Sequence, residues 1–289
     1  TVINSDKTGT LTMNAMTVSS MFAGGRWYRV EGSGYSKSGA ILGVAGSDLP
    51  DFTPLALGLC LCSDATVADD NSVIGDPTEA ALVVLAAKMG VDAEATRRSI
   101  ARISEVPFDS DYKFMATFHD RPPSVHGPVV SQPHLVAVKG GPDVVLDRCS
   151  HALRDGELVP IGEMRDELLD ANRQMSEQGL RVLAFAARGL DDATMAAASA
   201  DPMDSVTDLV VVGLVGIIDP LRPEAAAAVH TALGAGIDVR MITGDHTITA
   251  RAIADELGLG PGVLTGMELQ AMSDDEVIDA LPGLHVFGR

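Results

Sequence analysis

The pattern of apolar and polar positions changes near residue 209. From there on, apolar strands alternate with helices rich in alanine. The strands are expected at Leu209 to Asp219 and Asp238 to Thr243, and the helices at Pro223 to Leu233 and Thr247 to Leu257. Such alternation is typical of a parallel sheet with helices on both faces. We therefore predict this sheet in 209–289, with a ligand site beyond the carboxyl ends of its strands.

The beginning of the chain resembles these later strands. The apolar residues Thr1-Val2-Ile3 are followed at once by the polar run Ser5-Asp6-Lys7-Thr8-Gly9-Thr10, which predicts a strand that ends in a loop. One strand cannot form a sheet, so we expect this strand to join the sheet of 209–289. Residues 15–208 then form a domain inserted after it.

The inserted segment contains signals for both strands and helices. Residues 16–30 predict a hairpin around Gly24-Gly25, and Pro77 is a suitable first residue for a helix. Further helices are expected at 54–62 and 161–178, and strands at 103–118, 135–138 and 181–187. Residues 119–134 are expected to form a surface loop.

Composition excludes several classes of protein. Forty acidic and 21 basic residues give a net charge of −19, the wrong sign for binding nucleic acid. The longest apolar stretch, Leu209 to Ile218, is too short to span a membrane, which takes about 20 residues. Cys60 and Cys62 lack the spacing of zinc or redox pairs, so we expect them to pack in a core. His119, His126 and His134 have no accompanying ligand cluster, so we do not expect a metal there.

Asp6 is the strongest candidate for chemistry. It follows a strand and precedes a stretch rich in hydroxyls and backbone amides, which can cradle an anion. A second carboxylate, in Thr243-Gly244-Asp245, follows another strand. This arrangement suits magnesium-assisted transfer of a phosphoryl group onto a carboxylate. The spacing is equally compatible with an Asp6 that only caps a turn.

The motifs themselves resemble those of the P-type ATPases. The residues Ser5-Asp6-Lys7-Thr8-Gly9-Thr10-Leu11-Thr12 resemble the family's phosphorylation signature. Other matches follow in the family's order along essentially the whole chain: Leu61-Cys62-Ser63-Asp64-Ala65, Gly75-Asp76-Pro77-Thr78-Glu79, Pro107-Phe108-Asp109-Ser110, Lys139-Gly140-Gly141-Pro142-Asp143, Asp219-Pro220-Leu221-Arg222 and Thr243-Gly244-Asp245. The set, with Val30-Glu31-Gly32-Ser33-Gly34-Tyr35, is most similar to the branch that contains calcium pumps.

The resemblance implies roles for individual residues. Asp6 would be phosphorylated by ATP, and Asp6 and the main-chain carbonyl of Thr8 would hold Mg²⁺. Phe108 would stack on adenine, although from its position alone core packing is the simpler reading. The remaining nucleotide or phosphoryl contacts would come from Glu79, Lys113, Lys139, Gly140, Arg181, Thr243, Gly244, Asp245 and Arg289.

The resemblance also implies an architecture. Residues 1–14 and 209–289 would form a haloacid-dehalogenase-like α/β phosphorylation domain, and 15–208 an inserted α+β nucleotide-binding domain with an antiparallel sheet flanked by helices. The chain ends before a later family motif that supplies a magnesium-binding Asp, so we expect the phosphorylation domain to be truncated. The parent would be a cation pump with its ATP site on the cytoplasmic face of a membrane, and the partners of this soluble piece would be the pump's transmembrane and actuator parts.

Two alternatives remain at this point. A soluble phosphatase of the same superfamily would carry a second Asp two positions after the nucleophile, where this chain has Thr8. The chain by itself could also be a nucleotide-binding module without turnover, because the phosphorylation domain is expected to be incomplete.

Overall fold

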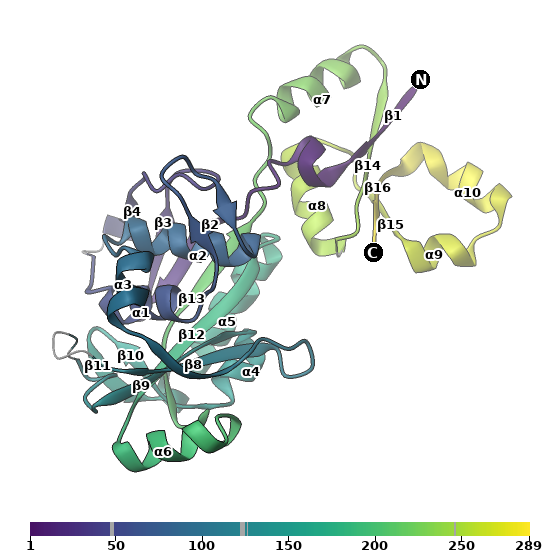
Figure 1. Ribbon diagram of the computed structural model, residues 1–289. Helices are drawn as coiled ribbons and strands as arrows, with labels where there is room; N and C mark the ends of the chain where they lie inside the picture. Colours follow the sequence, from purple (N-terminus) through teal and green to yellow (C-terminus); the bar gives the residue numbers. More distant parts are fainter. Residues whose placement is uncertain (47–48, 122–124, 126, 246) are drawn as a thin grey trace. The chain divides into compact units, whose positions relative to one another are not determined.

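The protein divides into two compact units. A computed structural model describes residues 1–46, 49–121, 125, 127–245 and 247–289 (Figure 1). Unit 1 comprises Thr1–Ala15, Gln174–Arg181 and Ile218–Arg289, and unit 2 comprises Met16–Arg173 and Val182–Ile217. Among the described residues, no helix is long and apolar enough to cross a membrane.

Unit 1 is built on a four-stranded parallel sheet. Its strands lie in the order β1-β14-β16-β15, so the first strand of the chain pairs directly with β14. The strands are β1 (Val2–Asp6), β14 (Asp238–Ile242), β15 (Gly262–Thr265) and β16 (Leu284–Gly288). Residues separated by more than 230 positions therefore end side by side (Figure 1).

Two helices contribute to the core of unit 1. Ala225 and Val229 of α7 (Ala225–Gly234) and Ala250 and Ile253 of α8 (Thr247–Glu256) pack with the buried strand residues. By contrast, the short helices α9 (Gly266–Ala271) and α10 (Asp274–Ala280) bury no residue. Each begins with a capping box, in which a Thr or Ser side chain and a Glu side chain satisfy the first backbone N–H groups.

Unit 2 contains a large, mainly antiparallel sheet. Eight of its strands lie in the order β4-β3-β2-β13-β12-β9-β8-β7, and the β10–β11 hairpin joins β13. The strands are β2 (Thr17–Ala23), β3 (Arg26–Val30), β4 (Ile41–Gly43), β7 (Arg102–Val106), β8 (Phe114–Asp120), β9 (His134–Gly140), β10 (Cys149–Arg154), β11 (Glu157–Pro160), β12 (Arg181–Leu190) and β13 (Leu209–Ile218). A separate two-stranded sheet pairs β5 (Thr66–Val67) with β6 (Val73–Ile74).

Helices complete the core of unit 2. They are α1 (Thr53–Leu61), α2 (Pro77–Lys88), α3 (Ala93–Ser99), α4 (Pro142–Leu146), α5 (Ile161–Glu177) and α6 (Asp192–Ala200). Helices α1 and α2 are buried along most of their length and contact β9 and β2 respectively. In α5, Met164, Leu168, Ala171 and Met175 are buried at spacings of three and four residues, which is the apolar stripe of a helix that covers a core.

Two local features follow directly from sequence. The β2–β3 hairpin turns at Gly24 and Gly25, whose φ angles of 62° and 79° are those that a tight two-residue turn requires. Helix α2 begins at Pro77 because the Asp76 side chain accepts hydrogen bonds from the N–H groups of Thr78 (2.8 Å) and Glu79 (3.1 Å). That cap places Glu79 in the first turn.

The strand Leu209–Ile218 corrects one expectation. We expected it in the parallel sheet of 209–289, but β13 lies between β2 and β12 in unit 2. Its residues from Leu209 to Ile217 are buried, and a continuous apolar run fits the centre of either kind of sheet.

The segment Gln174–Arg181, expected within the inserted domain, belongs to unit 1. Gly179 lies against α8, where an added Cβ would come within 2.9 Å of the Ala252 Cβ.

Other strands and loops begin and end at residues that differ from those expected from sequence. The strand expected at 103–118 is two strands, β7 and β8, separated by the loop 107–113. The loop expected at 119–134 is shorter, because His119 lies in β8 and His134 begins β9. His126 lies outside the described residues. His119 is 1% exposed and its Nδ1 lies 3.1 Å from the Ala101 carbonyl oxygen, which makes it a core residue.

Candidate functional site

Asp6 lies at the carboxyl end of β1, where it is opposite Ile242 of β14. Its side chain is exposed. The backbone then turns sharply through Lys7–Leu11, with Gly9 at a φ of 77°, a value that glycine adopts without strain. The side chain of Lys7 points away from solvent and is 5% exposed. The turn therefore presents Asp6 to solvent and buries the residue next to it.

Long-range contacts hold this turn in place. The Thr12 hydroxyl donates to Asp219 Oδ2 at 2.6 Å, and the Ala15 N–H donates to Asp219 Oδ1 at 3.2 Å. Arg222 Nη2 donates to the Gly9 carbonyl at 2.9 Å. Asp219 is 6% exposed, so its hydrogen bonds form in a dry environment, where leaving them unmade is costly. Asp219 and Arg222, to which sequence reasoning gave no role, thus fasten the middle of the loop and the segment that follows it.

Lys7 links the loop to the segment after β14. Its Nζ lies 2.5 Å from Asp245 Oδ2 and 3.9 Å from Asp219 Oδ2. The Asp245 N–H donates to the Thr243 hydroxyl at 3.1 Å, and its carbonyl accepts from the Arg289 N–H at 2.8 Å. Asp6 and Thr243-Gly244-Asp245 therefore follow neighbouring parallel strands at one edge of the sheet. In this structure the Asp245 carboxylate pairs with Lys7.

The donors near Asp6 are hard oxygen atoms. An exposed carboxylate and the carbonyl of Thr8 suit Mg²⁺, which binds through one or two carboxylates and keeps waters or phosphates as its other ligands. Among the described residues, no group of three or more His, Cys, Asp or Glu side chains is arranged to hold a metal. The exposed carboxylate and the carbonyl oxygen are donors of the kind that suits a magnesium ion shared with a phosphate ligand.

In unit 2, the buried Lys139 forms an ion pair with the partly buried Glu79. Glu79 Oε1 contacts Lys139 Nζ, with the two side chains 16% and 7% exposed. The other carboxylate oxygen, Oε2, accepts from the N–H groups of Asp64 at 2.7 Å and Ala65 at 3.1 Å. The two residues come from α2 and β9, which are 60 positions apart in sequence.

Lys113 and Gly140 come together just beyond this pair. Lys113 has a φ of 56°, and its carbonyl accepts from the Gly141 N–H at 3.0 Å. A Cβ on Gly140 would lie 2.6 Å from that carbonyl oxygen, so only glycine allows this approach. The Lys113 side chain is 59% exposed, and its Nζ lies 3.9 Å from Asp143 Oδ2. Its ammonium is thus available to solvent and to ligands.

Phe108 lies in the loop between β7 and β8 and is 60% exposed. Core packing, the alternative interpretation, is therefore wrong for this residue. The loop is held by Tyr112, whose hydroxyl donates to the Pro107 carbonyl at 2.6 Å. By contrast, Phe114 of β8 is buried and has Arg148 4.5 Å from its ring centroid. Phe108 thus presents an open ring face of the kind that stacks on a base.

Two of the expected nucleotide contacts, Arg181 and Arg289, belong to unit 1 and not to unit 2. Arg181 is the exposed first residue of β12 and belongs to unit 1, as does the exposed Arg289. Glu79, Phe108, Lys113 and Lys139 belong to unit 2. The structure brings Glu79 and Lys139 into contact and joins Lys113 to the Gly140-Gly141 backbone.

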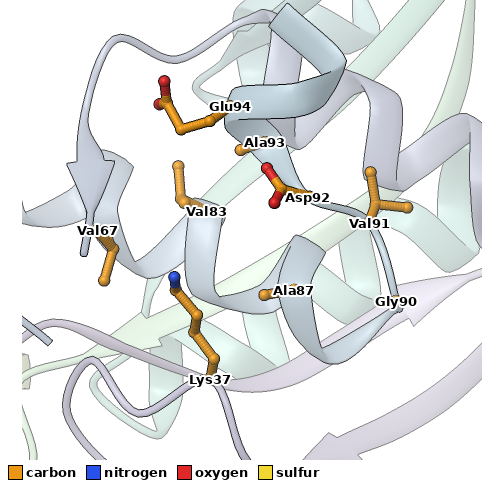
Figure 2. A pocket seen from close by; sticks show the side chains of 9 residues that line it. All are labelled: Lys37, Val67, Val83, Ala87, Gly90, Val91, Asp92, Ala93 and Glu94. Atoms are coloured by element: carbon orange, nitrogen blue, oxygen red, sulfur yellow. The ribbon is translucent and has the colours of Figure 1, made fainter. Parts of the chain in front are cut away.

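A pocket of about 250 Å³ lies elsewhere in unit 2, between α2, α3 and β5 (Figure 2). Val67, Val83 and Ala87 supply apolar surface, and Lys37, Asp92 and Glu94 supply charge. These charges have partners: Lys37 pairs with Asp69, Asp92 caps α3, and Glu94 pairs with Arg97. The pocket contains none of the residues expected to bind nucleotide.

The cysteines take no part in a reactive site. Cys60, Cys62 and Cys149 are buried free thiols, as expected for packing residues. Burial raises the pKa of Cys60 and of Cys149 to about 12, and it also raises the pKa of Cys62. All three therefore stay protonated at neutral pH and are poor nucleophiles.

Comparison with known proteins identifies the family. Residues 51–224 match the family model for the P-type ATPase cytoplasmic domain N. The chain belongs to the P-type ATPases. Over its whole length it is 42% identical to the cation-transporting ATPase pma1 of Synechocystis sp., of which it covers 32%.

Other relatives agree with this assignment. The chain is 35% identical to calcium-transporting ATPase 1 of Lactococcus lactis, of which it covers 30%. It is 36% identical to the probable cation-transporting ATPase F of Mycobacterium bovis, of which it covers 32%. The chain thus falls among the cation-transporting P-type ATPases and spans about a third of the length of these relatives.

Proposed function

We propose that this chain is the ATP-binding and autophosphorylated cytoplasmic region of a P-type cation pump. In this proposal unit 2 binds ATP, Asp6 of unit 1 accepts its γ-phosphoryl group, and the aspartyl phosphate drives cation transport in the full-length protein. The observation that carries it is the exposed Asp6 on a loop fastened by Lys7, Asp219 and Arg222. The membrane-spanning and actuator parts of the same pump would be its partners, on the cytoplasmic face of the membrane.

The chemical step is an in-line displacement. A carboxylate oxygen of Asp6 attacks the γ-phosphorus of ATP, the bond to the bridging β,γ-oxygen breaks, and ADP leaves with that electron pair. Thr243, Gly244 and Asp245 would contact the phosphoryl group. Mg²⁺ held by Asp6 and the Thr8 carbonyl would neutralise phosphate charge. Lys7 would keep Asp245 at the correct distance from Asp6 through the 2.5 Å ion pair.

The residue at position 8 favours this step over phosphatase activity. A phosphatase of the same superfamily uses a second carboxylate there to activate water, whereas Thr8 has no group with a suitable pKa. The aspartyl phosphate would therefore persist, and a long-lived intermediate can be coupled to conformational change. Turnover of a small phosphate ester by this chain would favour the phosphatase instead.

In unit 2, Phe108 would stack on adenine, with Lys113, Lys139 and Gly140 nearby. The support is the exposed ring of Phe108, the exposed ammonium of Lys113 and the close approach of Gly140 to the Lys113 carbonyl. Arg181 and Arg289 would add positive charge from unit 1. Because Asp6 and these residues of unit 2 belong to different units, binding and phosphoryl transfer can be tested separately.

For the 289-residue chain alone we propose nucleotide binding without turnover. Calorimetric titration with MgATP is expected to show one site in unit 2, and a phosphate-release assay is expected to show no activity above the Asp6→Asn control. Absence of ATP binding would contradict the assignment of unit 2. Steady hydrolysis that depends on Asp6 would contradict the absence of turnover.

A further inference from the structure

A larger pocket in unit 2 lies among β3, the start of α1 and the turn between β10 and β11. Its volume is about 660 Å³, within the range of roughly 300–1,000 Å³ that is usual for small-molecule sites. Tyr28 lines it from β3, Leu55 from α1, and Asp155 and Gly156 from the β10–β11 turn. The described residues that line it include none of those expected to bind nucleotide, so this pocket is a separate feature of unit 2.

The inner wall of this pocket is mainly apolar. Leu55 and Val212 are buried, and Phe52 and Leu153 are partly buried against the core. The rings of Phe52 and Tyr28 pack edge to face, with their centroids 5.1 Å apart. Aromatic and aliphatic side chains that line one pocket favour a ligand with a ring, because ring contacts add to the burial of apolar area. The pocket therefore suits a ligand with an apolar, ring-containing body.

The Tyr28 hydroxyl is a buried polar group at this inner wall. Tyr28 is 1% exposed, and its hydroxyl has no hydrogen-bond partner in the part of the chain that the structure describes. Burial raises the pKa of this hydroxyl above its ordinary value, so at neutral pH it is protonated and able to donate. A buried hydroxyl without a hydrogen bond is unfavourable. A ligand that reached Tyr28 with an acceptor atom would remove that cost.

The charged side chains of the pocket restrict the charge of the ligand. Arg26 and Asp155 are exposed and pair with each other at 2.8 Å, and Asp51 is a further exposed acid. An anion would meet two carboxylates and one guanidinium, whereas an ammonium group has no lone pair to accept the Tyr28 proton. A hydroxyl group can accept a hydrogen bond from Tyr28 and donate one to the Asp155 carboxylate. A neutral ligand with a hydroxyl group therefore matches the polar groups of this pocket.

We infer that this pocket is a second ligand site of unit 2, which binds a neutral ring compound that carries a hydroxyl group. The apolar wall holds the ring, and Tyr28 recognises the hydroxyl. The inference goes beyond the proposed function and does not depend on it, because the pocket shares no lining residue with the expected nucleotide site or the Asp6 loop.

Two probes that differ by one hydroxyl group test the inference. The ¹⁵N-labelled 289-residue chain would be titrated with 2-naphthol and with naphthalene, and amide shifts would be followed by NMR. We expect shifts in β3, in residues 49–55 and in the β10–β11 turn, with 2-naphthol bound about fivefold more tightly, the gain typical of one hydrogen bond. No shift in these segments, or equal affinity for the two probes, would overturn the inference.

The variant Tyr28→Phe removes the hydroxyl and keeps the ring. Its affinity for naphthalene is expected to equal that of the wild type, and its affinity for 2-naphthol is expected to fall about fivefold. The matched control Tyr35→Phe removes a hydroxyl from a partly buried tyrosine outside the pocket and is expected to keep the fivefold preference. A preference that survives Tyr28→Phe would contradict the role of this hydroxyl.

Asp155→Asn supplies a second variant, at the exposed rim, that leaves the core intact. Position 155 has a φ of 48°, which asparagine also adopts readily, so this change is expected to preserve the turn. We expect the preference for 2-naphthol to fall to about twofold, because a neutral amide oxygen is a weaker acceptor than a carboxylate. An undiminished preference in both variants would overturn the inference.

Saturating MgATP separates this pocket from the proposed nucleotide site. The affinity for 2-naphthol is expected to be the same with and without MgATP. Displacement of 2-naphthol by MgATP would place the probe in the nucleotide site and overturn the inference, while the proposed function would stand. A chain that bound 2-naphthol at this pocket but not MgATP would contradict the proposed function alone.

Discussion

The two units use buried charge in the same way but expose different chemistry. In unit 1, Lys7 lies between Asp219 and Asp245, and the adjacent Asp6 is exposed. In unit 2, the buried Lys139 pairs with the partly buried Glu79, and the exposed groups are the Phe108 side chain and the Lys113 ammonium. Unit 1 thus presents an exposed carboxylate, whereas unit 2 presents an aromatic side chain and positive charge.

The comparison teaches that ion pairs made by a buried lysine position neighbouring groups. Each pair joins segments far apart in sequence, 238 positions for Lys7 and Asp245 and 60 for Lys139 and Glu79. Each also lies next to an exposed residue or loop of the candidate site. A buried pair contributes little net stability by itself, but loss of one partner is costly. These pairs therefore act mainly as constraints on geometry.

The largest expected effect is that of removing the buried cation of unit 1. Lys7→Met leaves the nearly buried Asp219 carboxylate without a counter-charge, and we expect unit 1 to lose about 3 kcal/mol of unfolding free energy. Amide hydrogen exchange would measure the loss at β1 and β14. Trp27, the single tryptophan, lies in unit 2. Its fluorescence is therefore expected to report an unchanged unfolding transition of unit 2.

The matched control is Lys37→Met, which breaks the exposed pair with Asp69. Exposed pairs contribute about 0–1 kcal/mol, so hydrogen exchange in both units is expected to stay close to that of the wild type. If Lys7→Met were equally mild, the ion pairs of Lys7 would not constrain the Asp6 loop.

Mild acid is expected to weaken unit 2 through His119. Burial lowers the pKa of this imidazole to about 4, below its ordinary value of 6.5. The unfolded chain then binds the proton more readily, so the free energy of unfolding falls as pH decreases from about 6.5 to about 4. The loss is of the order of 2–3 kcal/mol. Urea unfolding followed by Trp27 fluorescence at a series of pH values would measure it.

The variant His119→Gln tests whether His119 causes this dependence of the unfolding free energy on pH. Without a titrating imidazole, this contribution to the pH dependence is expected to disappear, whereas the exposed His230→Gln variant is expected to retain it. If the unfolding free energy of His119→Gln fell with pH as it does in the wild type, other groups would be the cause of the acid sensitivity.

Removing the exposed aromatic ring of unit 2 is expected to have a smaller effect, which concerns nucleotide affinity and not stability. Phe108→Ala is expected to weaken MgATP binding about tenfold, because base stacking on an aromatic ring contributes about 1–3 kcal/mol. Since Phe108 is 60% exposed, the unfolding midpoint is expected to change little. Calorimetric titration and thermal unfolding would measure the two quantities on one sample. Unchanged affinity would remove Phe108 from the nucleotide site.

Sequence patterns predicted the features that depend on neighbouring residues. The β2–β3 turn follows from two adjacent glycines, and the start of α2 follows from Asp76-Pro77. The placement of β13 did not follow, because an apolar run does not specify which sheet buries it. The sequence patterns of the short helices and of the β10–β11 hairpin were also too weak to predict these elements.

For the candidate site, motifs indicated the residues but not their contacts. The pairs Lys7–Asp245 and Glu79–Lys139 join distant segments, and no periodicity reports such a contact. A lysine next to Asp6 gave no sign that it would be buried. Exposure of Phe108 was equally hidden, since a phenylalanine beside a strand is more often part of a core.

The central claim is that Asp6 accepts the phosphoryl group of ATP. The most direct measurement is labelling of the full-length protein that contains this chain with γ-³²P-ATP, followed by acid quench. The wild type is expected to form an acid-stable phosphoprotein that hydroxylamine cleaves, as expected of an acyl phosphate, and Asp6→Asn is expected to form none. Normal labelling of Asp6→Asn would contradict the account.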